Sequence, residues 1–566
     1  MKKIVVFFMT LMLVFVITGC GKKPTAKIEN EVIRRSSYKF DLTVDDKDMV
    51  TKGSVSVNFY KVAKKEETLV STKTLTTFSE TVTVNGLESN TDYRCDVLCT
   101  YDKKSHIIYT WYIKTVEEGT EFEPVIINSA NELVERINDD YSSDVYYKLG
   151  KDIDFNEYVD ENGAKKEFSG LSSTSSSAFE GLLDGDGHTI KNVSINSSVT
   201  YNGFFGYLKG KVENVTFEDI NINVSRDSSS TTYVGAICGY GYQAQLNNVT
   251  CKNITVTVSA ATQYTAGLVG YAFATNINSL ELTDLNLSVT KPTTGSSSTA
   301  YVGGLTSYIC QNSSSKFGKI YDVEISGTTT ISQIDTLYYG GLVGLLKAGS
   351  RIDKAIANIN STIKTKGETR IGGLIGQANL NSVDVDEYIT NVVAKGNINY
   401  KSYMDEAVIE NTSDMFIGGL IGSATAVIVD SAYIEMDIDI EAKIAKDKYL
   451  YSGLVFGSGY EYHTTLKKSF INGSIKAITD GSDADGKNSI HGFDGASYMD
   501  GVDEKTYSTI DLNTVGYSKI ELDIDGVVQD YSGTIELNNA STKAKWNLNI
   551  WKNITVENGK LTVDFE

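Results

Sequence analysis

The chain has 566 residues, and its 72 acidic and 52 basic residues give a net charge of −20 and an isoelectric point near 4.8. An acidic chain of this kind repels the phosphate backbone, so no nucleic-acid partner is expected. The four histidines are isolated from one another, no Cys-x-x-Cys pair occurs, and no glycine cluster precedes a helix as phosphate-binding motifs require. The sequence therefore predicts no metal site, no cofactor and no catalytic residue.

The first residues have the composition of an export signal. Met1-Lys-Lys3 is basic, and the apolar run from Ile4 to Ile17 has 14 residues. A run of this length is too short to span a membrane and is typical of a signal peptide. We therefore expect residues 1–19 to be a signal peptide.

The signal ends in Ile17-Thr-Gly-Cys20, which resembles the lipobox of bacterial lipoproteins. The resemblance implies that Cys20 is acylated and anchors the mature chain to the extracytoplasmic face of the cell membrane, exposed at the cell surface. Residues 20–26 would then form a basic tether that lies against anionic lipid. The alternative is an ordinary signal peptide with a chance cysteine.

Residues 27–118 contain six strand-like runs separated by turns such as Asn85-Gly86, at 38–44, 54–61, 67–76, 80–84, 93–101 and 107–115. This spacing predicts a β-sandwich. The segment Leu87-Glu-Ser-Asn-Thr-Asp-Tyr93 resembles the corner of fibronectin type III domains, with Ser89-Asn90 as a departure from the family pattern. The resemblance implies that the Tyr93 hydroxyl bonds back to the preceding loop, and that Phe40 substitutes for the tryptophan of the early strand.

Residues 119–200 are interpreted as the N-terminal cap and first coils of a solenoid. A polar cap followed by spaced aliphatic residues predicts a short amphipathic helix over Ser129–Ile137. Later in this segment, Asp184, Asp186 and His188 could form a catalytic or calcium-binding cluster. Because Asp-Gly-Asp-Gly is a turn sequence in its own right, the structural interpretation is favoured.

Between residues 201 and 478 a glycine-aliphatic motif, which we call the knot, recurs eight times at intervals of 31 to 46 residues. The copies lie at 202–206, 235–239, 266–270, 303–307, 340–344, 372–376, 418–422 and 452–456. A period of this length predicts a solenoid. In three copies, Ala236 replaces a central residue and Ser307 and Phe456 replace the last glycine, so we expect these coils to be distorted.

Each knot is followed by runs of alternating apolar residues, such as 212–217 and 220–224, which predict short strands with one inward face. A unit with so few inward residues cannot bury its own face, so the coils must stack, and the glycines allow their close approach. Asparagines recur where stacked coils could align their amides into a ladder, at Asn192, Asn214, Asn248 and Asn391. The sequence thus predicts an all-β chain with a right-handed parallel β-helix.

The eightfold knot resembles the GLUG-type repeats of bacterial surface and secreted proteins. The resemblance implies a parallel β-helix scaffold of the adhesin type and transfers no catalytic residue. Residues 479–566 would form the last coils and a C-terminal cap, because the segment 546–551 resembles the tryptophan-containing closing segment of such repeat proteins. A cap of this kind would cover the edge of the last coil.

Tyrosines precede the knots, at Tyr201, Tyr233, Tyr264, Tyr301, Tyr338, Tyr339 and Tyr451. If this column is exposed, it forms a platform for sugar rings or protein side chains, and it is the candidate binding surface. If it is buried, which we favour, it forms an aromatic stack that holds the coils together. Three inserts, at 225–232, 291–299 and 404–414, would project from one side of the solenoid and are the most plausible functional surface.

Five cysteines follow Cys20, an odd number that excludes a complete disulfide framework. Cys95 and Cys99 would lie on one strand face, too far apart for a disulfide, and are expected to be buried. Cys238 and Cys251 could bridge across one coil, but buried free thiols are favoured.

These features predict a lipid-anchored surface protein in which a fibronectin-like spacer carries a β-helix. The leading function is an adhesin or binding scaffold for a host protein or glycan, without catalysis. One alternative is a β-helix polysaccharide lyase or glycoside hydrolase, which would need paired carboxylates on one face of the coils. The other alternative is a passive structural spacer.

Overall fold

The computed structural model is all-β, with long parallel sheets. It describes residues 24–566 without 52–53, 64–65, 102, 118, 140–144, 228, 293–296, 312–316, 381–388, 405–406, 409, 412, 446–447, 461–463, 481–486, 496–508, 511–514, 532–552, 558–559 and 565–566. The expected signal peptide, Cys20 and the segment 546–551 lie outside the described residues. The chain divides into two compact units, Met1–Val125 and Ile126–Glu566, and each is described by itself.

The first unit contains two antiparallel sheets and a short helix, α1 (Lys47–Thr51). One sheet has the order β1-β2-β5, with β1 Ala26–Ile33, β2 Ser37–Val44 and β5 Ser79–Asn85. The other has the order β4-β3-β6-β7, with β3 Val55–Ala63, β4 Glu66–Thr74, β6 Asp92–Tyr101 and β7 Lys104–Lys114. Buried side chains from both sheets form one core. Six of these strands match the predicted runs to within three residues.

The expected tyrosine corner is present in this unit. Tyr93 is 1% exposed, and its hydroxyl accepts a hydrogen bond of 2.7 Å from the backbone N–H of Glu88. The core tryptophan comes from the last strand, since Trp111 of β7 packs edge-to-face on Phe40 with ring centroids 5.4 Å apart. The Trp111 indole donates to the Tyr38 hydroxyl at 2.8 Å. Phe40 of the early strand β2 therefore packs against a tryptophan that comes from a different strand.

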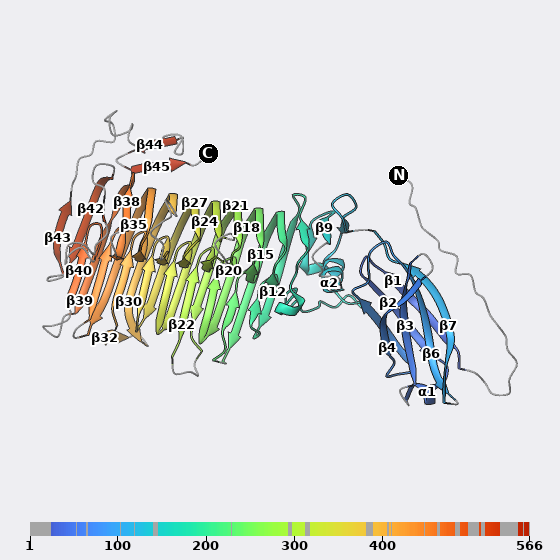
Figure 1. The fold of residues 1–566 in the computed structure, drawn as a ribbon. Coiled ribbons are helices and arrows are strands. Elements are labelled where there is room, and N and C mark those ends of the chain that lie inside the picture. The colour runs from blue at the N-terminus through green and yellow to red at the C-terminus, as the bar shows by residue number, and fades with distance from the viewer. Residues whose placement is uncertain are drawn as a thin grey trace. The chain divides into compact units, whose positions relative to one another are not determined.

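The second unit is built from three parallel sheets, and successive turns of the chain, which we call coils, each add one strand to every sheet (Figure 1). The long sheet contains β12 Thr189–Ser197, β15 Lys211–Arg226, β18 Gln245–Ala260, β21 Asn276–Thr290, β24 Lys319–Ile334, β27 Arg351–Thr365, β30 Ile389–Met404, β35 Ile428–Ile444, β39 Phe470–Asp480 and β42 Gly516–Ile524. This arrangement is consistent with a β-helix solenoid.

The other two sheets consist of short strands. The second sheet contains β13 Tyr201–Asn202, β16 Thr232–Val234, β19 Thr262–Ala266, β22 Thr299–Gly303, β25 Thr336–Gly340, β28 Thr369–Gly372, β33 Met415–Gly418, β36 Tyr449–Gly453 and β40 Lys487–His491. The third contains β14 Phe205–Leu208, β17 Cys238–Tyr242, β20 Val269–Phe273, β23 Thr306–Cys310, β26 Val343–Lys347, β29 Ile375–Asn379, β34 Ile421–Thr425 and β37 Phe456–Tyr460.

Shorter elements precede the long sheet, pair along it and follow it. They are β8 Val125–Ile127, α2 Ala130–Asp139, β9 Tyr146–Leu149, β10 Ile153–Asp154, β11 Leu182–Asp184, β31 Ala407–Val408, β32 Glu410–Asn411, β38 Thr465–Lys467, β41 Thr509–Ile510, β43 Val527–Tyr531, β44 Asn553–Glu557 and β45 Lys560–Asp564. The last two form an antiparallel hairpin.

The knot is the turn between the second and third sheets, and its glycines leave no room for a side chain. A Cβ atom on Gly340 would lie 2.1 Å from the carbonyl oxygen of Val343, within the same knot. On Gly341 it would lie 2.1 Å from the oxygen of Gly373 in the next coil. On Gly344 it would lie 2.5 Å from the oxygen of Ser307 in the preceding coil, so the glycines permit the turn and the stacking on both sides.

Two of the knots that depart from the pattern keep the regular stacking. The Ser307 hydroxyl donates to the carbonyl oxygen of Gly270 in the preceding coil, so the extra side chain has a partner. Ala236 is 2% exposed and its N–H donates to Gly267 at 3.0 Å. The strands that follow both knots pair without a register shift, so the expected distortion is wrong for these two coils.

The register also corrects the reading of the last knot. Gly453 pairs with Gly418, and Phe456 pairs with Ile421, which is an aliphatic position of the knot. The last glycine is therefore Gly457 and is retained. The residue that departs from the pattern in this coil is Leu454, at the second glycine position.

The long strands bend at residues with a left-handed backbone, which Asn and Asp tolerate better than most residues. Asn214 and Asn248 occupy one such bend, and their amides are hydrogen-bonded at 2.9 Å, as the ladder prediction requires. The strands have a second left-handed bend further along, at Asp219. Asn192 is in register with this second bend, and its amide donates a hydrogen bond to Asp154 instead of to another asparagine. Asn391 donates to Asp353 at 2.7 Å. The amide ladder is thus confirmed for one pair and is wrong for the other two residues.

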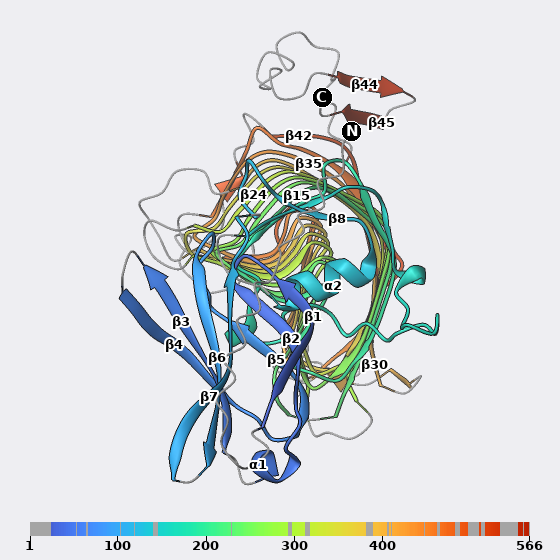
Figure 2. The same cartoon turned by 90° about the vertical axis from the view of Figure 1, so that its right-hand side faces the viewer.

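The predicted helix is confirmed as α2, which lies across the N-terminal end of the coils in Figure 2. The Ser129 hydroxyl accepts from the N–H of Glu132 at 3.1 Å, so Ser129 caps the helix. Leu133 and Ile137 are fully buried, which fits a helix that covers the first coils. At the other end β43 pairs antiparallel with β42, which ends the parallel order of the long sheet.

All five cysteines after Cys20 are buried free thiols. This confirms the prediction for Cys95 and Cys99, and it confirms free thiols over a bridge for Cys238 and Cys251. Burial raises the pKa of the Cys238 thiol, which therefore stays protonated.

The knot geometry predicts the effect of adding one methyl group. Gly341→Ala places a Cβ against the backbone of the next coil and should lower the free energy of unfolding by about 3 kcal/mol. Gly492→Ala is the matched control, because the nearest atom to its Cβ would be the Cγ2 methyl of the Ile520 side chain, at 3.3 Å, and no backbone atom lies within 4 Å. Urea denaturation followed by circular dichroism measures both, and equal losses would contradict the stacking role of Gly341.

Candidate functional site

Five of the predicted tyrosines form a stacked column on the outer face of the second sheet. They are in register on successive coils: Tyr201, Tyr233, Tyr264, Tyr301 and Tyr338. Ring centroids are 5.2 Å apart for Tyr201 and Tyr233 and 4.6 Å apart for Tyr264 and Tyr301, with the latter rings 4° from parallel. These separations are close to the distance between neighbouring strands, so the sheet itself sets the ring stacking.

The column continues with other flat side chains. The next residue in register is Arg370, whose guanidinium lies 5.0 Å from the Tyr338 ring and 5.4 Å from the Phe416 ring. Phe416 in turn stacks on Tyr451 at 5.2 Å. Arg370 thus fills a tyrosine position by a cation–π contact on each side.

A second column of tyrosines lies on the third sheet, and the sequence reasoning missed it. Its members are Tyr207, Tyr240, Tyr271 and Tyr308, which are stacked at 4.8, 4.9 and 4.5 Å. Each directly follows the last residue of a knot. This repeated position is the signal that could have identified the column.

The two columns contact each other edge to face. Tyr201 and Tyr207 are 5.3 Å apart with rings at 79°, and Tyr233 and Tyr240 are 5.3 Å apart at 77°. Apart from Tyr207, which lies on the fully buried strand β14, the tyrosines of both columns alternate along their strands with buried residues and so lie on outward faces. The contact between the columns shows that these faces meet at a re-entrant corner. We call the nine residues of the two columns the tyrosine strip.

The strip combines features of both expected alternatives, because its rings hold the coils together and, apart from the buried Tyr207, are only partly buried. Tyr264 has the ring of Tyr233 on one face and that of Tyr301 on the other. A sugar ring stacks on an open aromatic face, so rings in the middle of a column cannot accept one. The ring edges and hydroxyls are the parts available to a partner.

The other two predicted tyrosines are buried. Tyr339 is 1% exposed and alternates with Tyr338, so it points into the core and lies outside the strip. Tyr451 stands in register with the first column but is 3% exposed. Because both side chains are buried, Tyr339 and Tyr451 cannot contribute to an exposed binding surface.

Burial keeps the hydroxyls of the strip protonated. It raises the pKa of Tyr207 and of Tyr308 to about 12, from an ordinary value near 10. Tyr271 lies with its hydroxyl 3.8 Å from the Cys310 sulfur, and burial raises its pKa further. The strip therefore presents neutral phenols as hydrogen-bond donors over the physiological pH range.

The acidic turn before the first knot is structural, as the sequence favoured. Asp184 is 7% exposed, and its carboxylate accepts three hydrogen bonds, from the Tyr146 hydroxyl, the Asn214 amide and the Asp186 backbone N–H. Burial raises the pKa of Asp184, but these bonds outweigh it and leave the pKa lowered. Asp186 pairs with Lys148 at 3.0 Å, and His188 lies 3.3 Å from Asp152. These three residues do not converge on a common point.

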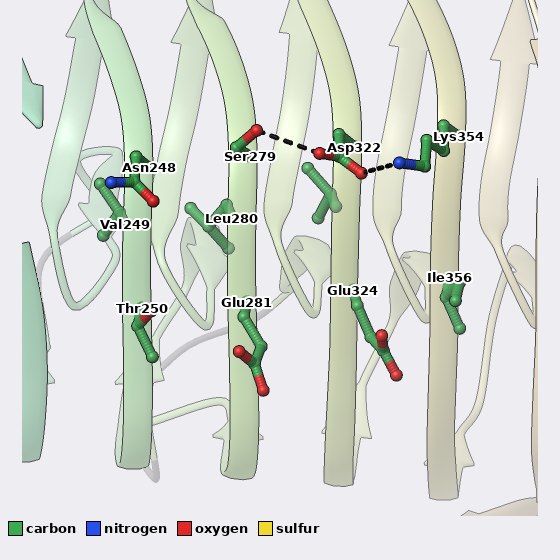
Figure 3. Close-up of a pocket in the computed structure, with 11 residues that line it drawn as sticks. Asn248, Val249, Thr250, Ser279, Leu280, Glu281, Asp322, Glu324, Lys354 and Ile356 are labelled. Carbon is green, nitrogen blue, oxygen red and sulfur yellow. Dashed lines mark hydrogen bonds and ion pairs between the residues drawn. The ribbon is translucent and has the colours of Figure 1, made fainter. Parts of the chain in front are cut away.

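A shallow hollow of about 270 Å³ lies on the outer face of the long sheet, across four coils (Figure 3). A row of bend residues forms one side, where Asp322 accepts from the Ser279 hydroxyl at 3.0 Å and pairs with Lys354 at 2.6 Å. Figure 3 shows Glu281 and Glu324 on neighbouring strands beyond this row. Both are exposed, and as neighbours in register they are candidates for the paired carboxylates that a hydrolase would need.

Within the part of the chain that the structure describes, no three His, Cys, Asp or Glu side chains lie close enough to hold a metal ion. In the same residues no helix is long and apolar enough to cross a membrane. The insert segments 225–232, 291–299 and 404–414 lie partly outside the described residues.

Comparison with known proteins gives one partial similarity. A stretch of 145 residues, 25% of this chain, is 32% identical to halomucin from Haloquadratum walsbyi and corresponds to 2% of that protein. No family model matches the chain, and no solved structure matches it. The similarity covers too little of either chain to assign a family.

The strip should make the solenoid sensitive to alkali. A phenol whose pKa is raised by folding stabilises the folded state fully below its unfolded pKa near 10, and this stabilisation is lost as the pH rises through about 12. Thermal unfolding between pH 8 and pH 12 should therefore show a falling midpoint above pH 10. A parallel absorbance titration should show Tyr207 and Tyr308 within a group of tyrosines that ionises late, and ionisation of all tyrosines near pH 10 would contradict the packing.

Proposed function

We propose that the chain is a lipid-anchored surface protein whose solenoid is a binding scaffold, without catalysis, for an extracellular protein or glycan. The observation that carries the proposal is the tyrosine strip, which runs in register over five successive coils. Tyrosine is enriched in protein interfaces because it offers a large rigid contact area and a polar tip.

The stacking suits the strip to binding. A tyrosine such as Tyr240, held between Tyr207 and Tyr271, has little rotational freedom left to lose when a partner docks. A protein surface can pack on the ring edges and accept bonds from the hydroxyls. A glycan would bind through the same hydroxyls, since the ring faces are covered.

The N-terminal unit is proposed to be a fibronectin type III-like β-sandwich that acts as a spacer. Support comes from its two antiparallel sheets with a shared core and from the Tyr93 corner. The second unit is proposed to be a right-handed β-helix of GLUG-type repeats with a C-terminal cap. Support comes from the eightfold knot and the three parallel sheets.

A second candidate function is polysaccharide cleavage by a β-helix lyase or hydrolase. Glu281 and Glu324 favour it, because they are adjacent in register and line the hollow on the long sheet. Their exposure disfavours it, since a catalytic carboxylic acid needs a pKa raised by an enclosed site. A passive spacer remains the third candidate, and it would leave the strip without a partner.

Binding through the strip predicts a loss when its hydroxyls are removed. The triple variant Tyr233→Phe, Tyr240→Phe, Tyr338→Phe keeps every ring stack and should weaken binding about tenfold, because three hydrogen bonds of about 0.5 kcal/mol each are lost. Tyr321→Phe is the control, since Tyr321 is 47% exposed on the long sheet outside the strip. The readout is an array of extracellular-matrix proteins and glycans probed with the full-length chain.

A reducing-end assay on the same glycans runs beside the array. Binding without new reducing ends supports the scaffold, and release of ends overturns it and makes Glu281 and Glu324 the residues to change. Binding that the triple variant leaves unchanged would place the contact elsewhere on the molecule.

The lipid anchor is tested at Cys20. Cys20→Ala should abolish acylation and move the chain from the membrane fraction to the soluble exported fraction. Ser54→Ala, a substitution in the first unit, controls for expression. Membrane retention of the Cys20 variant equal to that of the unchanged chain would disprove the anchor.

A further inference from the structure

One outer face of the long sheet carries only amide and hydroxyl side chains over six coils, β15 to β30. Every second residue in the C-terminal half of these strands points away from the core, and two rows lie in register. The first row is Asn221, Thr255, Asn286, Thr328, Asn360 and Asn397. We call this row together with its neighbour, two residues further along each strand, the amide-hydroxyl face.

The second row repeats the chemistry of the first. Its residues are Asn223, Thr257, Ser288, Thr330, Thr362 and Asn399. At one end the rows are bounded by charge, because the next residues in register are Asp437 and Asp439 of β35, and at the other end they continue into Ser194 and Asn196 of β12. In a chain with 22% charged residues and a net charge of −20, a neutral surface of this extent is unusual.

Strand formation does not explain these residues. Threonine favours strands, but asparagine is depleted in them, and six asparagines occupy these rows. Stacked asparagines could be explained by an amide ladder, but in the first row Asn221 and Asn286 are separated by Thr255, which interrupts one.

The polar groups of the face also have few partners within the protein. In the described residues, the side-chain hydrogen bonds of both rows are the one from Asn223 to Asn196 at 3.2 Å and the long one from Thr328 to the Leu285 carbonyl at 3.5 Å. The side chains are exposed or half-exposed. Their donors and acceptors are therefore available to a ligand.

The geometry of the face is that of a regular lattice. Neighbouring strands are about 4.8 Å apart, and alternate residues along a strand are about 6.7 Å apart. Hydrogen-bonding groups in such an array match a repeating polymer that lies flat, and many weak contacts then add up to stable attachment. The polymer must carry hydroxyls, and it must be uncharged, since an anionic chain is repelled by the protein and a cationic one would prefer its acidic surfaces.

We propose that the amide-hydroxyl face binds a neutral polysaccharide, whose sugar hydroxyls exchange hydrogen bonds with the amides and hydroxyls of the two rows. This inference rests on the proposed scaffold function and names a ligand class for it. The site is separate from the tyrosine strip, which lies on the second and third sheets.

The test is co-sedimentation of the full-length chain with particles of cellulose, chitin and starch, with anionic alginate beads as comparison. Thr330→Lys places a long charged side chain in the middle of the face, where it would hold a flat polymer away, and binding to the neutral polymer should fall at least tenfold. Ser474→Lys is the matched control, because Ser474 continues the first row beyond Asp437 and its lysine would pair with that carboxylate.

Three outcomes decide the inference. Sedimentation with a neutral polymer that Thr330→Lys reduces and Ser474→Lys leaves within twofold supports it. No sedimentation with any neutral polymer, or equal binding by both variants, overturns it. If the chain binds a protein of the matrix array but sediments with no neutral polymer, the polysaccharide inference fails and the scaffold function stands. If the chain binds in neither assay, the proposed function fails as well.

Discussion

The structure of the second unit depends on the absence of a side chain at the knot. A Cβ on Gly341 or Gly373 would meet the backbone carbonyl of the next coil at 2.1 Å, which no rotamer change can relieve. With hydrogen in that place, Leu342 can donate its N–H to Leu374 at 2.9 Å, and the coils approach to the spacing of a parallel sheet. Glycine occupies this position in five coils that stack through this contact, at Gly267, Gly304, Gly341, Gly373 and Gly419. Ala236 and Leu454 occupy the same position in two other coils.

Once the coils stack in register, each position of the repeat becomes a column, and its chemistry depends on where the column points. Inward columns such as Ile222, Val256 and Leu287 are apolar and fully buried or nearly so. Columns at bends contain residues that tolerate a left-handed backbone, as at Asn214. Outward columns are free of both constraints, and here they differ most, from stacked tyrosines to neutral amides.

Features that depend on the repeat period and on composition could be predicted from the sequence. Features that depend on which residues pair between neighbouring coils could not. Sequence patterns were sufficient for the knots, the helix α2, the free thiols and most strands. Glycine spacing and apolar alternation are properties of residues close together in the sequence, so they can be recognised without knowing which coils pair. The identity of the last glycine as Gly457 and the place of Asn192 at a second bend depend on which residues pair between coils. Strand β1 was missed because its exposed polar residues do not alternate with apolar ones. The second tyrosine column could have been predicted, because each of its tyrosines directly follows the last residue of a knot. Its contact with the first column could not, because that contact depends on the angle between two sheets.

The same stacking separates columns that stabilise from columns that can recognise a partner. In the tyrosine strip, the faces of rings such as Tyr264 are already occupied by neighbouring coils, so the strip contributes to stability and retains only edges and hydroxyls for binding. In the amide-hydroxyl face, residues such as Asn286 and Thr330 add little to the stack, since their side chains are exposed and make no hydrogen bond to the next coil within the described residues. A substitution in the strip therefore changes stability and binding together. A substitution in the face changes what meets the surface and leaves the stack intact, and this difference makes the two surfaces separable by experiment.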